Sequence, residues 1–409
     1  MTDEISNIKP SDADTSKVSQ VSAETIGNNP FGLKASKILI VTTTDSMIWH
    51  FLVPHIKSML TNGCIVECAC SKTGFYFDNL KSSLKIKIHE LHFNRHPLRL
   101  QNLTAFIELK KLIRQNNYDI LHCHEPVGGA ISRLAGHKYC KRIVYTAHGF
   151  HFFEGNSSLN NFLYKNIERY LAKKTDMLIT MNEEDYRAAA SFKLRSNSSL
   201  VYKINGIGID TDSFNNPKLD KLEFCKTFNI DQSKKILLSV GECIPRKNHL
   251  VLIKAMEQID ENAILLICGC GILYNQLIAF ANKSNACDRI FFMGFQKEMF
   301  SIYTSADVFV TSSLQEGLPC SVMEAMASKL PVVASKIRGH VDLIDDSGGF
   351  LIDPNDVCAF ADSINTLLHN PVLASEMGMH NKEKIKMYDT SFVLNEMKLF
   401  YSKLMECVK

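Results

Sequence analysis

The sequence predicts an α/β protein built from two parallel sheets with helices packed against them, on the basis of three observations. Short runs rich in β-branched residues alternate with longer segments of helical periodicity from Lys37 onward. The alternation stops at a polar stretch over residues 212–221 and then restarts. The chain has 409 residues, of which 45% are apolar, and this length is sufficient for two hydrophobic cores.

The predicted strands are short apolar runs that end in polar turns. Those of the first half are KILIVTT, CIVECACS, KIKIHELHF, YDILHCHE, RIVYTAHG, DMLITMN and SLVYKI, and those of the second half are KKILLSVG, AILLICG, RIFFMG, ADVFVTS, PVVAS and GGFLID. Helices are expected between them, with the most regular periods over residues 50–60 and 103–114. Because ligands of open α/β sheets bind outside the carboxyl ends of the strands, we expect the active site between the two sheets.

The two ends of the chain differ in character. Residues 1–36 are polar and rich in Ser, Asn and Asp, and they predict a disordered leader without a secretory signal. Residues 390–408 carry apolar side chains at helical spacing and predict an amphipathic helix that could pack on either domain. The chain therefore divides into a leader (1–36), two domains (37–212 and 213–388) and a C-terminal helix (389–409).

Composition restricts the function and the compartment. The net charge is +3, far from the charge of a dedicated nucleic-acid binder. Thirteen cysteines without a C-x-x-C pair indicate reduced, core-filling thiols in a cytoplasmic chain. No apolar run is long enough to span a bilayer, so the chain can lie on a membrane but not through it. His122, Cys123 and His124 lack a second ligand pair nearby, which disfavours a metal site.

The most informative stretch is TSSLQEGLPCSVMEAMASKLPVVAS, in which a strand ends, a loop carries Glu316 and Gly317, and a helix begins near Pro319. Backbone amides and the positive helix end could there receive a pyrophosphate. Glu324 follows eight residues after Glu316, so the two carboxylates can address the hydroxyls of a sugar and of a ribose. Taken alone, the two glutamates could equally be a helix-terminal residue and a solvated one.

Further candidates follow other predicted strands. Arg246 and Lys247 stand at the mouth where a diphosphate would lie, and a leaving diphosphate needs cationic stabilisation when no metal is present. His148 precedes Gly149 and should project into the cleft from the carboxyl end of a strand. The pair Gly269 and Gly271 ends a strand and opens a helix, but the full G-x-G-x-x-G pattern is absent.

The chain resembles glycosyltransferase family 4 over nearly its whole length from Lys37. The resemblance rests on EGLPCSVMEAMASKLPVVAS, which resembles the E-x(7)-E region, and on the ordered motifs DILHCHEPVGG, YTAHGFHFFEG, INGIGIDTDSF, SVGECIPRKNH, ICGCG and FMGF. TAHGFHF is similar to the subgroup that builds bacterial capsular, exopolysaccharide or lipid-linked glycans. The resemblance implies a GT-B fold, in which two Rossmann-like domains face each other across a cleft and the C-terminal helix can cross back to the N-terminal domain.

The resemblance also implies the chemistry and the site. It implies a retaining enzyme that needs no metal or cofactor, in which the second domain binds a nucleoside-diphosphate sugar and the first binds the acceptor. Glu316 would contact donor sugar hydroxyls, Glu324 the ribose and Lys247 the diphosphate, and His148 would lie beside the donor sugar. The expected catalytic residues are His148, Lys247, Arg246 and Glu316; the donor-binding residues are Gly241, Gly269, Gly271, Met293, Gly294, Glu316, Gly317, Leu318, Pro319 and Glu324; the acceptor-side residues are Thr44, Asp45, His124 and His151.

The expected function is transfer of a hexose or N-acetylhexosamine, from a UDP-sugar in particular, to a glycan or polyprenyl-diphosphate-linked acceptor in bacterial surface polysaccharide synthesis. A non-catalytic GT-B partner subunit is the alternative, because Glu242 stands where that family often has an arginine; Arg246 could substitute for it. A location on the inner face of the cell membrane would suit a lipid-linked acceptor. Several basic residues of the first half could meet anionic headgroups or form a solvated surface: Lys57, Arg95, Arg99, Lys110, Lys111 and Arg114.

Overall fold

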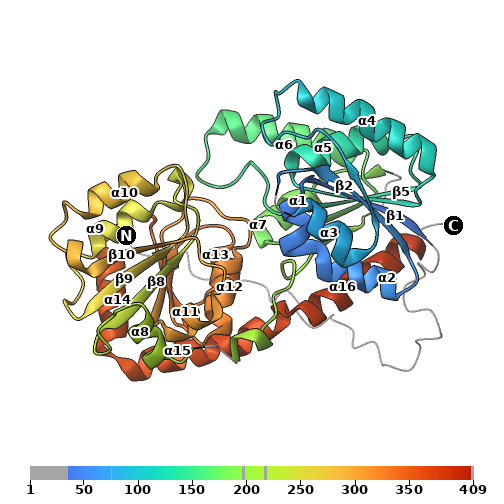
Figure 1. The fold of residues 1–409 in the computed structure, drawn as a ribbon. Coiled ribbons are helices and arrows are strands. Elements are labelled where there is room, and N and C mark those ends of the chain that lie inside the picture. Colours follow the sequence, from blue (N-terminus) through green and yellow to red (C-terminus); the bar gives the residue numbers. More distant parts are fainter. Residues whose placement is uncertain (1–35, 75, 196–198, 216–218, 407–409) are drawn as a thin grey trace, which may run out of the picture.

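The computed structural model describes residues 36–406 except 75, 196–198 and 216–218. These residues form two α/β domains that lie side by side (Figure 1), each around one sheet of parallel strands. The first sheet has seven strands in the order β3-β2-β1-β4-β5-β6-β7, and the second has six in the order β10-β9-β8-β11-β12-β13. The predicted leader lies outside the described residues, apart from Ser36.

Every predicted strand is confirmed, because each strand of the two sheets coincides with one of the apolar runs, and only β1 extends beyond its run, by the single residue Thr44. The first sheet comprises β1 (Lys37–Thr44), β2 (Ile65–Ser71), β3 (Lys87–Glu90), β4 (Ile120–His124), β5 (Arg142–Ala147), β6 (Met177–Thr180) and β7 (Val201–Lys203). The second comprises β8 (Lys235–Val240), β9 (Ala263–Cys268), β10 (Ile290–Gly294), β11 (Val308–Thr311), β12 (Val332–Ser335) and β13 (Gly349–Ile352).

Helices alternate with the strands in both domains. The first domain contains α1 (Asp45–Met47), the π-helical turn η1 (Ile48–Leu52), α2 (Val53–Thr61), α3 (Phe77–Leu84), α4 (Gln101–Asn116), α5 (Pro126–Gly136), α6 (Ser158–Ala172) and α7 (Glu183–Ala190). The second contains η3 (Asp212–Asn215), α8 (Lys221–Thr227), η4 (Pro245–Lys247), α9 (His249–Ala255), α10 (Tyr274–Ala281), η5 (Cys287–Arg289), α11 (Phe300–Ser305), α12 (Cys320–Ala327), α13 (His340–Leu343), α14 (Val357–His369), α15 (Pro371–Lys384) and η6 (Ile385–Tyr388). None of the helices in the described parts of the chain is both long and apolar enough to cross a bilayer.

The central strand β1 is buried on both faces, which explains its continuous apolar sequence. Ile38 and Ile40 point into a core formed with α2 and α3, whereas Leu39 and Val41 point into a core formed with α4 and α5. Because successive strand residues face opposite sides, a run without polar interruption is expected wherever helices cover both faces. The register of β1 with β2 and β4 brings their carboxyl ends to one edge.

The last helix, α16 (Thr390–Glu406), crosses back from the second domain to the first (Figure 1). Its buried residues Val393, Met397, Phe400 and Leu404 belong to the core that β1 shares with α2 and α3. The sequence predicted the helix but left open which domain it covers. The structure places it on the first domain, so the second domain is tied to the first by the chain itself.

The two crossings between the domains lie beside each other. Ile209 N donates to Tyr388 O at 3.1 Å, and Thr390 N donates to Ile209 O at 2.9 Å. The Thr211 hydroxyl donates to Asp389 Oδ2 at 2.8 Å. The connection therefore pairs two chain segments just before residues 212–221, the polar stretch at which the alternation of strands and helices stops in the sequence. Residues 216–218 of this stretch lie outside the described part.

Candidate active site

The loops that follow the carboxyl ends of the strands in both sheets border one cleft of about 780 Å³. His50, Phe51, His148, Gly149 and His151 border it from the first domain. The second domain contributes residues from the loops after β8, β11 and β12 and from the start of α12: Val240, Gly241, Glu242, Arg246, Lys247, Gln315, Glu316, Gly317, Leu318, Pro319, Cys320, Ser321, Glu324 and Arg338. The cleft is thus at the strand edge where ligands of open α/β sheets bind.

Glu316 is the centre of a compact charge cluster on the second-domain side. Lys247 Nζ lies 2.7 Å from Glu316 Oε1, and Arg246 Nη1 lies 3.0 Å from Oε2. Arg246 also donates to Gln315 O at 2.7 Å. Burial alone would raise the pKa of the Glu316 carboxyl, but the two cations outweigh it and lower the pKa to about 2. Glu316 is therefore ionised at neutral pH, and two cations remain at the mouth of the cleft.

Glu324 has a different environment on α12. In the described part of the chain it forms no ion pair, and burial raises the pKa of its carboxyl to about 7, with the nearby Tyr303 hydroxyl only partly opposing the shift. The helix begins at Cys320 with Pro319 as its N-cap residue, so the proline stands one position earlier than its usual place inside the first turn. The two motif glutamates thus share one cleft but ionise over different pH ranges.

The first-domain side carries histidines instead of charged groups. His148 Nε2 lies 3.1 Å from His124 Nδ1, so one of these nitrogens donates to the other. Burial, followed by the neighbouring His55, lowers the pKa of His148 to about 4. The ring is therefore neutral near pH 7, where it can donate or accept a hydrogen bond but carries no charge.

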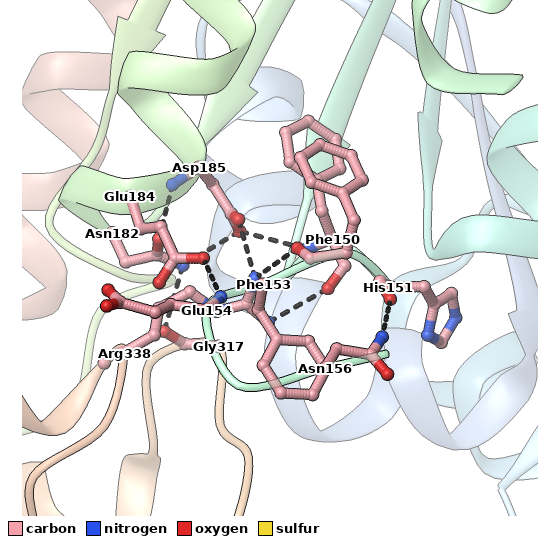
Figure 2. A network of polar contacts seen from close by, with 12 residues as sticks. Phe150, His151, Phe153, Glu154, Asn156, Asn182, Glu184, Asp185, Gly317 and Arg338 are labelled. Atoms are coloured by element: carbon pink, nitrogen blue, oxygen red, sulfur yellow. Dashed lines mark hydrogen bonds and ion pairs between the residues drawn. The ribbon is translucent and has the colours of Figure 1, made fainter. Parts of the chain in front are cut away.

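The two sides touch through glycine backbone. A Cβ on Gly317 would lie 1.7 Å from His148 O, and a Cβ on Gly149 would lie 3.0 Å from the Gly317 Cα. Asn182 Nδ2, from the residue before α7, donates to Gly317 O at 3.1 Å (Figure 2). Because no side chain fits at Gly317, this glycine permits the two domains to meet beside the cleft.

Several residues predicted for the donor site do not border this cleft. Gly269 and Gly271 let the loops after β8 and β9 approach each other, since an added Cβ would lie 2.0 Å from Gly241 O or 2.5 Å from Cys243 O. Gly294 accepts a backbone hydrogen bond from Gly269 N at 2.8 Å, and Met293 packs partly buried against the second-domain core. Gly269 and Gly271 thus lie in the loop after β9 that packs against the loop after β8, whereas Met293 and Gly294 belong to β10.

The predicted acceptor-side residues also separate. His151 borders the cleft, whereas His124 is buried behind His148. Asp45 is fully buried and accepts hydrogen bonds from the backbone amides of Ser46 and Thr73. Thr44 is 6% exposed, and its hydroxyl is 3.0 Å from the Ser46 hydroxyl. Of the four, the structure brings only His151 directly to the cleft.

The residues bordering the cleft that sequence reasoning missed include His50, Phe51 and Arg338. Arg338 follows the carboxyl end of β12, and that position was the available signal. Figure 2 shows its guanidinium among residues of the first domain, beside Asp185 and Phe150. Within the described residues, no group of three or more His, Cys, Asp or Glu side chains could hold a metal ion. His122 instead contacts the hydroxyls of Tyr401 and Thr146.

Known families match both domains. Residues 37–182 match the family described as Glycosyl transferase 4-like, and residues 220–384 match the family described as Glycosyl transferases group 1. Among solved structures, Anabaena Alr3699/HepE in complex with UDP and glucose superposes with a TM-score of 0.74 at 18% identity, covering 90% of this chain and 100% of that chain. Sucrose-phosphate synthase from Thermosynechococcus elongatus superposes with a TM-score of 0.73 at 20% identity, covering 91% and 100%.

Curated relatives extend over most of the chain. EpsD of Bacillus subtilis (strain 168), which is named as a glycosyltransferase, is 34% identical over 90% of this chain and 97% of its own length. The UDP-Gal:alpha-D-GlcNAc-diphosphoundecaprenol alpha-1,3-galactosyltransferase of Escherichia coli is 29% identical over 67% of this chain and 72% of its own length. With matches to both domains and a relative of this identity and coverage, the chain belongs to the group 1 and 4-like glycosyltransferases, enzymes of GT-B fold that transfer sugars.

Proposed function

We propose that this enzyme moves a hexose or N-acetylhexosamine from a UDP-sugar to a glycan or polyprenyl-diphosphate-linked acceptor with retention of anomeric configuration and without a metal. The carrying observation is the cluster of Lys247, Arg246 and Glu316 in the cleft. Its two cations can stabilise the negative charge that develops on a departing diphosphate, a role that a metal ion fills elsewhere. Glu316 balances one of the two charges and offers oxygens to sugar hydroxyls.

The carboxylates of the cleft bear on the route by which an enzyme with retention of configuration would react. A covalent intermediate would require a carboxylate that is free to attack the anomeric carbon. Each oxygen of Glu316 is held by a cation, which makes it a weak nucleophile, and Glu324 is mostly protonated below neutral pH. We therefore propose a same-face substitution, in which the departing diphosphate oxygen helps to deprotonate the acceptor hydroxyl. The neutral His148 donates or accepts a hydrogen bond at the donor sugar.

The test uses purified protein in the presence of a chelator and a panel of UDP-, GDP- and ADP-sugars. Protection from thermal unfolding and slow donor hydrolysis are recorded for each donor. We expect a UDP-sugar to give both signals, and Glu324→Ala to abolish the protection. Nuclear magnetic resonance of the product anomer reports retention or inversion. A protein that responds to no donor would instead behave as the partner subunit, which the family membership and the intact cluster disfavour.

A lipid-linked acceptor is favoured by an exposed apolar surface on the first domain, which we call the α4–α6 surface. Large apolar side chains that are 42% to 87% exposed lie on α6 and on α4 with its preceding loop: Leu98, Leu100, Leu103, Ile107, Leu159, Phe162, Leu163, Ile167 and Tyr170. Soluble proteins rarely expose so many large apolar side chains together unless the surface binds something. A groove of about 300 Å³ lies between α5, α6 and the loop before α4, and His151 borders both this groove and the cleft.

The charge of the α4–α6 surface fits an anionic membrane. Arg95, Arg99, Lys110, Lys111 and Arg114 belong to the α4 segment, and their positive charge complements anionic headgroups. Lys57 does not belong to this surface, because α2 covers the opposite face of the sheet together with α16. We propose that the enzyme lies on the inner face of the cell membrane, with the lipid chain of its acceptor in the groove and the sugar in the cleft.

Vesicle sedimentation tests this membrane contact. The protein should bind phosphatidylglycerol vesicles at low salt, and Phe162→Glu should weaken binding. Val372→Glu, an equally exposed apolar position on α15 of the second domain, is the matched control and should have no effect. Failure of the unaltered protein to bind at low salt would exclude the membrane contact and leave the transferase proposal intact.

A further inference from the structure

Arg338 lies between β12 and α13 of the second domain, yet its guanidinium is buried against the first. The residue is 7% exposed. Its Nη1 donates to Asp185 Oδ1 at 2.8 Å and to Phe152 O at 3.1 Å, and its Nη2 donates to Phe150 O at 2.9 Å. All three acceptors belong to the first domain (Figure 2). One side chain of the second domain is therefore anchored in the other domain.

The same guanidinium also holds the loop that carries Glu316. Its Nε donates to Glu316 O at 3.0 Å. Arginine has five N–H donors, and four of them are thus used by protein acceptors. Its charge is balanced by Asp185, so Arg338 is a poor diphosphate ligand even though it borders the cleft. Its geometry instead connects the loop of Glu316 with the loop that begins at His148.

Asp185 completes the connection from the first domain. It is fully buried, and its Oδ2 accepts from Phe150 N at 3.0 Å and from Asn182 Nδ2 at 2.9 Å. The amide of Asn182 also reaches Gly317 O. One carboxylate oxygen of Asp185 therefore binds Arg338, which holds the backbone of Glu316, and the other binds the backbone amide of Phe150 in the loop that begins at His148.

Separation of the domains would break this network as a unit. Arg338 would lose three acceptors, and Asp185 would lose its only cation among the described residues. A buried ionised group that loses its partner is strongly destabilised. The contact between the domains and the positions of the loops that carry Glu316 and His148 therefore depend on the same hydrogen bonds.

We propose that Arg338 and Asp185 are positioning residues that assemble the active site from its two halves. Neither side chain contacts the reacting atoms. Arg338 holds the backbone of Glu316 and of the loop after His148 at a fixed separation, so that the donor bound by the second domain faces the first-domain histidine. This inference rests on the proposed function for the roles of Glu316 and His148, but the domain connection itself can be measured without any substrate.

The test compares Arg338→Lys and Asp185→Asn with a matched control inside one domain. Arg195 has a similar arrangement, since its Nε donates to Asp176 Oδ1 at 2.8 Å and its Nη1 and Nη2 donate to the carbonyls of His137 and Lys141. All of these groups belong to the first domain. Arg195→Lys therefore weakens a comparable arginine–aspartate cluster without touching the cleft, and it measures the effect of lost stability alone.

Kinetics distinguish positioning from stability. A lysine cannot reach four acceptors at once, so we expect Arg338→Lys to lower kcat on the order of tenfold to a hundredfold. Asp185→Asn should act in the same direction. Donor affinity, measured by titration, should change less than about twofold, because the donor contacts of the second domain remain. Arg195→Lys should lower Tm and leave kcat unchanged. Equal kcat in Arg338→Lys and Arg195→Lys would overturn the proposal.

Amide hydrogen exchange supplies the measurement that needs no substrate. The Phe150 amide donates to Asp185, so the segment 148–156 should exchange faster in Arg338→Lys and Asp185→Asn but not in Arg195→Lys. Unchanged exchange in all variants would overturn the positioning role whatever the activity. If segment 148–156 exchanges faster in these two variants but the unaltered protein uses none of the donors, the proposed function is wrong and the connection between the domains through Arg338 and Asp185 is still supported.

Discussion

The two motif glutamates lie in different surroundings, one in the loop before α12 and the other on α12 itself, and these surroundings shift the pKa values of the two carboxyls in opposite directions. In the loop, Glu316 meets Lys247 and Arg246, and its pKa falls to about 2. On the helix, Glu324 is without a cation among the described residues, and burial raises its pKa to about 7. The spacing of the two residues in the sequence does not reveal this difference. The neighbours of Glu316 keep it charged at neutral pH, whereas burial makes the charge of Glu324 change near neutral pH.

The difference separates two tasks within one cleft. A permanently charged group with two cations suits the stabilisation of charge that develops during reaction. A carboxyl that titrates near pH 7 suits binding, since its ionised form accepts two hydrogen bonds from vicinal hydroxyls and its neutral form accepts them less well. Substitutions that alter one carboxyl or its neighbours at a time therefore test whether the two glutamates have separate roles.

The largest effect is expected from removing a cation of the cluster. Lys247→Ala should lower kcat by about 10²–10³-fold, because developing diphosphate charge loses a preorganised partner. Donor affinity should fall much less. Steady-state kinetics and calorimetric titration of the donor measure the two quantities. Lys254→Ala removes an exposed lysine of α9 and is the matched control. Equal turnover in Lys247→Ala and in the unaltered enzyme would contradict a role for the cluster in catalysis.

Removing the fixed charge should have the next largest effect. Glu316→Gln leaves Lys247 and Arg246 without their shared carboxylate, and we expect kcat to fall on the order of a hundredfold. The carboxyl has a lowered folded-state pKa, so its stabilisation is present above the unfolded pKa of 4.5 and is lost as the pH falls towards 2. Denaturation measured against pH should therefore show less acid sensitivity in Glu316→Gln than in the unaltered enzyme.

The titratable glutamate should affect binding and its pH dependence. Donor affinity should rise on the order of tenfold between about pH 5.5 and pH 8 as Glu324 ionises, and this rise should vanish in Glu324→Gln. Its folded-state pKa is raised, so its stabilisation is full below 4.5 and is lost as the pH rises through about 7. Glu324→Gln should therefore gain relative stability at alkaline pH. An unchanged pH dependence of donor binding would remove the distinction between the two glutamates.

The smallest effect is expected on the histidine side of the cleft. His124→Gln replaces the ring that orients His148, and loss of one neutral hydrogen bond should lower kcat only a few-fold, about threefold to tenfold. Because His148 has a pKa of about 4, the pH dependence above about pH 5.5 should keep its shape. A shift of the profile near neutral pH in this variant would show that His148, and not Glu324, titrates there.

Local patterning predicted most of the fold. The apolar runs of β1 to β13 reflect burial on both faces of a parallel sheet, and the run that indicates this burial consists of residues next to one another in the chain. Position after a strand was likewise sufficient to select Lys247, Glu316 and His148 for one cleft. It was not sufficient for Gly269 and Gly271, because a glycine needed for loop contact has the same sequence pattern as one needed by a ligand.

By itself the sequence determined two sheets, their strands, the family resemblance and the charged motif. Only the tertiary structure decided that α16 covers the first domain, that Gly317 must lack a side chain opposite His148, and that Arg338 binds Asp185. Arg338 and Asp185 are 153 residues apart. The physical reason is that periodicity and turn chemistry act over a few residues, whereas a contact between domains depends on two distant segments that meet only after both sheets have formed.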